Sequence, residues 1–145
     1  MRITLSAVGL AVLLGTASFS GSAEAARGPS LYTRLGGKPA IRAVVEDFVG
    51  NVAADPRINK QFAKTNLPRL RRLLTEQICA GTGGPCKYTG RSMKEAHRAL
   101  GVTGSDFGAL VEDLQTSLKK FGVPAREQGE LLAILGPMKK DIVTR

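Results

Sequence analysis

Hydrophobic residues in this chain recur at spacings of three and four, which is the period of an amphipathic helix. The first such stripe comprises Ile41, Val44, Val45, Phe48, Val49 and Val52. It follows Pro39, which suits the first turn of a helix, and it ends at Asp55-Pro56, because a residue before proline avoids helical angles. These signals predict a long helix over residues 39–54.

A second stripe begins after Thr65-Asn66, a pair suited to capping a helix. Its inner positions are Leu67, Leu70, Leu73, Leu74 and Ile78, with arginines on the opposite side. The stripe ends in a run of residues that a helix does not tolerate, Gly81, Gly83, Gly84 and Pro85. Two brief turns complete this half, one capped by Ser30 and one from Arg57 to Phe62.

The second half of the chain also shows only helical periods. Ser92 and Glu95 form a capping box before a short helix, which we expect Gly101 to stop. Its inner face carries Met93, Ala96, His97 and Leu100. Thr103 or Ser105 caps the next helix, whose stripe is Phe107, Leu110, Val111, Leu114, Leu118 and Phe121. The last stripe contains Leu131, Leu132, Leu135, Met138 and Ile142, with a kink expected at Gly136-Pro137. No segment alternates like a strand, so we predict an all-α fold.

The first residues have the layout of a secretory signal peptide. A positive start, an apolar core from Leu5 to Leu14 and small residues up to Ala25 predict cleavage after Ala25. The alternative is a membrane anchor, but this core is shorter than the ~20 residues that span a bilayer. We therefore expect residues 1–25 to be a signal peptide and residues 26–145 to form one domain, exported to the periplasm and without a transmembrane segment after cleavage.

The charge balance is strongly basic, with 21 Lys and Arg against 12 Asp and Glu, a net charge of +9. Basic proteins attract anions, and nucleic acid is the usual partner. Here no zinc spacing and no basic motif interleaved with aromatic residues supports that interpretation, and an exported protein rarely meets nucleic acid. We expect a solvated face, a membrane surface or acidic ligand groups instead.

The two cysteines, Cys79 and Cys86, are seven residues apart. In an oxidising compartment such a pair favours a disulfide, and two separate buried thiols are the alternative. Two cysteines and one histidine do not make a structural zinc site. Covalent attachment of a c-type haem needs Cys-x-x-Cys-His, a sequence that does not precede His97.

His97 is the only histidine, and it lies on the apolar face of a short helix. Taken alone, such a histidine is more often a packed or partly exposed residue than a metal ligand. Haem is the exception, because it brings four nitrogen ligands of its own and needs only one axial imidazole from the protein.

Seven segments in a fixed order carry a resemblance to a known family. They are Leu31-Tyr32-Thr33-Arg34-Leu35-Gly36-Gly37, Val44-Val45-Glu46-Asp47-Phe48, Phe62 through Thr65-Asn66, Gly83-Gly84-Pro85 with Tyr88-Thr89-Gly90, Met93-Lys94-Glu95-Ala96-His97, Gly122-Val123-Pro124, and Leu135-Gly136-Pro137-Met138. From Ser30 to Val143 the chain resembles the group I truncated haemoglobins. The resemblance implies a two-over-two helical sandwich enclosing one non-covalent haem b per chain, with His97 on the iron.

The resemblance also implies the surroundings of that haem. Phe62 should stack on its face, and Thr65 and Tyr88 should lie near its propionates, with Lys87, Arg91 and Lys94 as candidate charge partners. The pocket walls should be Leu70, Met93, Ala96, Val102, Phe107, Leu110 and Leu135.

The distal side departs from the family pattern. Where the family places a hydroxyl donor, directly after the residue matching Phe48, this chain has Val49. A distal glutamine is replaced by Leu74, and a further iron-ligand position is occupied by Leu73. Gln77 is the remaining candidate donor to a bound gas. The alternative is that Gln77 is a helix residue that faces solvent.

The function that this resemblance implies is reversible binding of a diatomic gas, namely oxygen, nitric oxide or carbon monoxide. Alternatives are a periplasmic enzyme, of nitric oxide dioxygenase or peroxidase type, and electron transfer with an electron donor as partner. An apolar distal pocket counts against the enzymes, because they need stabilised oxygen or an acid–base group. A helical adaptor without haem is the last alternative.

Overall fold

The structure is a computed structural model and describes residues 28–145. The expected signal peptide, residues 1–25, lies outside the described residues. Within the described part every regular element is helical, which confirms the all-α prediction. None of these helices is both long enough and apolar enough to cross a membrane.

The N-terminal half contains three helices and a 3-10 turn. Helix α1 (Leu31–Arg34) is capped by Ser30, as predicted, and α2 (Gly37–Ala54) follows after a sharp corner. Gly36 and Gly37 have φ of 96° and 76°, a left-handed conformation that glycine adopts without strain. The turn η1 (Asn59–Phe62) leads to α3 (Leu67–Gly81), which begins at the predicted cap, Asn66.

The short helix α4 (Met93–His97) has the predicted capping box between Ser92 and Glu95. We expected Gly101 to stop this helix, but it ends at His97 and a turn follows, in which the Leu100 N–H donates to the His97 carbonyl. Gly101 then takes a φ of 63°, so the glycine reverses the chain after the turn and not at the helix end.

Helix α5 (Gly104–Lys120) is capped by Thr103, which resolves the choice between Thr103 and Ser105. We placed Phe121 on the inner stripe of this helix. Helix α5 ends at Lys120, however, so Phe121 is the C-cap residue and is 46% exposed. The last stripe is divided into α6 (Ala125–Leu135), the 3-10 turn η2 (Gly136–Met138) and α7 (Lys139–Ile142). The expected kink at Gly136-Pro137 is this 3-10 turn.

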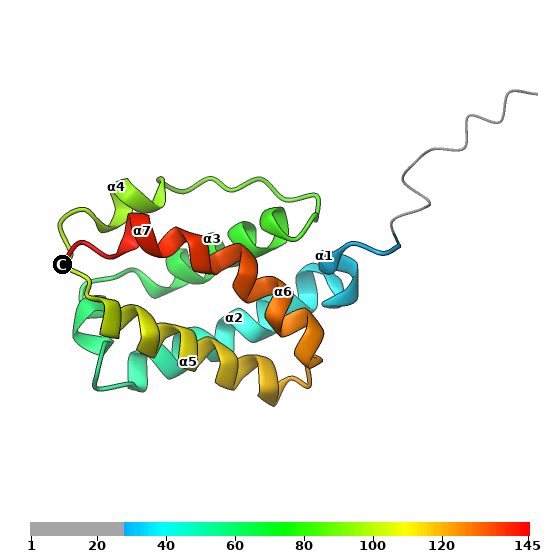
Figure 1. Cartoon of the computed structure of the whole chain (residues 1–145), viewed down its shortest axis with the longest axis horizontal. Coiled ribbons are helices and arrows are strands. Elements are labelled where there is room, and N and C mark those ends of the chain that lie inside the picture. Colours follow the sequence, from blue (N-terminus) through cyan, green and yellow to red (C-terminus); the bar gives the residue numbers. More distant parts are fainter. Residues whose placement is uncertain (1–27) are drawn as a thin grey trace, which may run out of the picture.

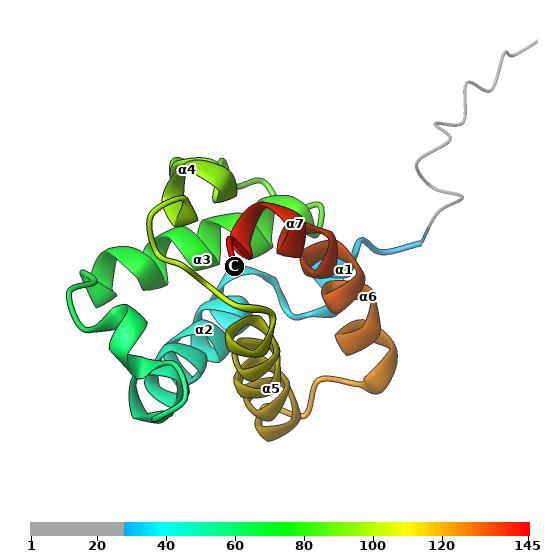
Figure 2. The same ribbon diagram turned by 60° about the vertical axis from the view of Figure 1, so that its left-hand side comes forward.

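The helices form two layers. In both Figure 1 and Figure 2, α3, α4 and α7 lie above α2 and α5, and α6 joins the layers at one end. Helix α2 packs against both α3 and α5, and α4 packs against α7. The whole predicted α2 stripe is buried. The hydrophobic core is therefore centred on α2, and the candidate functional site lies beside this core.

Candidate functional site

A cavity of about 870 Å³ opens between the two layers. Its volume falls within the ~300–1,000 Å³ that is usual for small-molecule and cofactor sites. All sixteen residues that the sequence places around a haem line it: Phe48, Val49, Phe62, Thr65, Leu70, Leu73, Leu74, Gln77, Tyr88, Met93, Ala96, His97, Val102, Phe107, Leu110 and Leu135. Residues from six separate helical segments thus converge on one space.

The wall formed by α2 and α3 is aliphatic and aromatic. Phe48 and Val49 from α2 are 5% and 1% exposed, and Leu70, Leu73 and Leu74 face the same cavity from α3. None of these five side chains has a hydrogen-bond donor. A ligand against these five side chains would meet only apolar surface.

His97 lines the cavity at the end of α4 and is half-buried. Its Nδ1 lies 2.7 Å from the Met93 carbonyl oxygen, one helical turn earlier. A carbonyl only accepts, so Nδ1 must donate its proton and Nε2 keeps its lone pair. This backbone hydrogen bond is the one that usually orients a metal-bound imidazole.

The residues present fit a cofactor that brings its own metal. Among residues 28–145, no group of three or more His, Cys, Asp or Glu side chains could hold a free metal ion. A single oriented imidazole on a large apolar cavity suits a metal already held by four ligands, which is the situation in haem.

Gln77 does not face solvent. Its Nε2 donates to Met138 Sδ at 3.1 Å and lies 3.8 Å from Met93 Sδ, so the amide is directed into the cavity, toward η2 and α4. Thioether sulfur is a weak acceptor. The amide hydrogens of Gln77 are therefore only weakly satisfied here.

The polar edge of the cavity differs in part from the expectation. Arg91 lines it as proposed, but Lys87 and Lys94 do not. The sequence reading missed Lys64, Arg69 and Lys139, which do line it. The one feature of the sequence that could have indicated them is their position, because each lies within two residues of a residue assigned to the pocket or to the last inner stripe.

Tyr88 connects this edge to the loop before α4. Its hydroxyl donates to the Arg91 carbonyl at 2.8 Å. Burial raises the pKa of the Tyr88 phenol, and Glu76 raises it further, while Arg91 and Arg69 act in the opposite direction. The phenol therefore remains a neutral donor.

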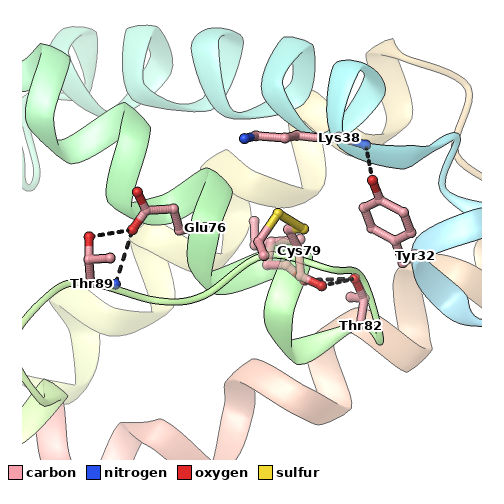
Figure 3. The surroundings of a disulfide bond; sticks show 8 residues. Tyr32, Lys38, Glu76, Cys79, Thr82 and Thr89 are labelled. Carbon is pink, nitrogen blue, oxygen red and sulfur yellow. Dashed lines mark hydrogen bonds between the residues drawn. A yellow bond between two sulfur atoms is a disulfide. The ribbon is translucent and has the colours of Figure 1, made fainter.

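The loop between α3 and α4 is tethered to α3 at two points. A disulfide joins Cys79 to Cys86, whose Cα atoms are 5.7 Å apart. Further along, the Thr89 hydroxyl and N–H donate to the Glu76 carboxylate at 2.7 and 3.1 Å. Figure 3 shows both tethers on the same side of α3. Together they fix the stretch that leads through Tyr88 to His97.

Comparisons with known proteins agree with this geometry. The family model for bacterial-like globins matches residues 30–144. A group 1 truncated hemoglobin, GlbN, of Mycolicibacterium paratuberculosis is 37% identical, over 79% of this chain and 85% of its own length. The Synechocystis protein of the same name is 35% identical, over 80% of this chain and 98% of its own. The chain belongs to the bacterial-like globins, in their group 1 truncated branch.

Solved structures of truncated hemoglobins have the same fold as this chain. The truncated hemoglobin of Tetrahymena pyriformis, in its Fe(III) form, superposes with a TM-score of 0.77 at 30% identity, covering 81% of this chain and all of that one. The 2/2 hemoglobin of a Synechococcus species, which carries covalently attached heme, gives 0.75 at 32% identity, covering 81% and 100%. The two-over-two prediction is confirmed, and membership of the globin family implies haem binding.

Proposed function

We propose that this globin holds one non-covalent haem b through His97 and reversibly binds a diatomic gas: oxygen, nitric oxide or carbon monoxide. The single observation that supports the proposal best is the His97 imidazole, which lines the cavity with its Nδ1 proton donated to the Met93 carbonyl. That hydrogen bond leaves Nε2 as the donor atom for the iron. It also increases the basicity of the imidazole.

The other residues would bind and orient the cofactor. When bound, haem would supply a ferrous iron that can bind the gas. Phe62, Met93 and Phe107 provide apolar surface for the macrocycle. Arg69 and Arg91 provide positive charge for its carboxylates, since guanidinium groups pair well with carboxylates.

A gas bound in this cavity would meet the apolar wall around Val49 and Leu74. Such a wall excludes water and accepts apolar diatomic molecules, but it gives no hydrogen bond to a polarised ligand. We infer that oxygen is held weakly. The same absence of an acid–base group on this wall favours gas binding over nitric oxide dioxygenation or peroxidation.

Non-covalent attachment is supported by the state of the cysteines. Both thiols are engaged in the Cys79–Cys86 disulfide, so neither is available for a thioether bond to haem. The disulfide also supports export, because such bonds persist in oxidising compartments such as the periplasm.

The test is to remove the imidazole and then restore it. We expect His97→Ala and His97→Gly to lose normal haem binding, and free imidazole to restore the Soret band of the His97→Gly protein by entering the vacated space. Unchanged haem content and an unchanged Soret band in His97→Ala would refute the assignment.

A further inference from the structure

Positive charge is concentrated in one stretch of the chain. Residues 60–98 carry nine Lys and Arg against two Asp and Glu, so a net charge of +7 out of the total of +9 lies there. The two acidic residues are already engaged: Glu76 with Arg72 and Thr89, and Glu95 with Ser92. The excess of positive charge in this stretch therefore has no local counterpart.

Seven of these nine cations make no ion pair within residues 28–145, and all seven are exposed. We call them the basic rim: Lys60, Lys64, Arg69, Lys87, Arg91, Lys94 and Arg98. Arg71 and Arg72 are left out, because Glu46 and Glu76 pair with them.

Three of the seven residues of the basic rim line the cavity, and the other four lie on segments that contribute lining residues. Lys64 and Arg69 line it from the start of α3, and Arg91 lines it from the loop before α4. Lys94 lies on α4 itself, and Lys60 lies on η1, one turn before Lys64. In Figure 2, α4 and the first turns of α3 border the same side of the molecule. The two carboxylates of a haem would neutralise at most two of these charges.

We propose that the basic rim is the docking surface for a redox protein with an acidic face, which delivers electrons to the haem; this rests on the proposed haem function. The reaction is a transfer of one electron from the reduced flavin or haem of the donor to the ferric globin, which becomes ferrous. No bond forms or breaks. Encounter complexes for electron transfer are small and polar, so a group of like charges beside the cavity suits them.

An acidic protein fits this surface better than a lipid membrane. Membrane-surface helices combine a basic face with a substantial apolar one. Among the described residues the exposed large hydrophobics are Leu100 and Phe121, and Phe121 lies at the far end of α5 from the basic rim. Leu100 is two residues from Arg98, so the basic rim has one exposed large hydrophobic residue beside it, which is less than the apolar face of a membrane-surface helix.

The experiment measures the second-order rate at which reduced flavodoxin, an acidic FMN protein, reduces the ferric haem-loaded globin. Lys94→Glu and Lys60→Glu are compared with Lys119→Glu, an exposed lysine on α5 that makes the same change in net charge. At ~0.01 M salt we expect each rim variant to be about fivefold slower than the wild type, and Lys119→Glu to change by less than about twofold. At ~0.5 M salt the differences should disappear.

Photoreduced lumiflavin, which is uncharged, should reduce all four proteins at one rate, showing that the haem is equally accessible. Equal slowing of Lys119→Glu and the rim variants, or rates independent of salt, would overturn the proposal. So would rim-dependent binding to phosphatidylglycerol vesicles with unchanged flavodoxin rates. Failure of the haem function itself has a different signature, because the wild type would then lack a carbon monoxide spectrum, and the docking proposal would be overturned with it.

Discussion

A tyrosine at position 49 should slow the release of oxygen from this globin. Val49 is 1% exposed and lines the cavity from α2. The side chains of Phe48, Leu70 and Leu74, which line the same cavity, contain no hydrogen-bond donor. The larger ring would enter the cavity of about 870 Å³, so Val49→Tyr should not overpack the core. A hydroxyl donating to an oxygen with partial negative charge is worth about 1.5–3 kcal/mol. That corresponds to release about 10- to 150-fold slower.

The assay is stopped-flow displacement of oxygen by carbon monoxide from the ferrous protein. Val49→Phe is the matched control, because it adds the ring without the hydroxyl. Carbon monoxide is less polar, and its own release should change much less. Equal oxygen release from Val49→Tyr and Val49→Phe would refute the reasoning about the distal wall. If the wild type already releases oxygen slowly and Gln77→Leu accelerates it, then Gln77 is the donor.

Two further predictions concern stability. The double variant Cys79→Ala/Cys86→Ala should lower the free energy of unfolding by about 2.4 kcal/mol, which is the loop-closure entropy for a sequence separation of 7. Urea unfolding without reductant measures this difference, and equal stability of the two proteins would contradict it. Asp113→Asn should stabilise the fold at about pH 7 but not at about pH 3, since burial, together with the charge of Asp55, raises the pKa of Asp113. The gain should grow as pH rises above the ~3.9 of an unfolded aspartate, and a gain that is largest in acid would contradict it.

The helices could be predicted from the sequence because their signals are local. The stripe from Ile41 to Val52 records which face of α2 is buried, and Asn66 and Ser92 mark helix starts through their own side-chain hydrogen bonds. The helix ends are not local in this sense. The end of α4 at His97 depends on the turn that follows, and the exposure of Phe121 depends on where α5 stops.

The polar edge of the site could not be predicted in the same way. Whether Lys64 or Lys87 lines the cavity depends on the paths of the loops before and after α3, and contacts between separate segments set those paths. The direction of Gln77 is set by Met93 and Met138, which lie 16 and 61 residues further along the chain. Such long-range partners leave no periodic signal in the sequence.

The central claim, that His97 is the iron ligand, can be tested directly because the chain contains one histidine. Labelling the protein with ¹⁵N-histidine therefore labels only position 97. Resonance Raman spectra of the ferrous, gas-free protein should contain an iron–imidazole stretching band that moves to lower frequency in the labelled sample. A haem-loaded protein whose iron–ligand band does not move with the label would show that another group holds the iron, and would contradict the account.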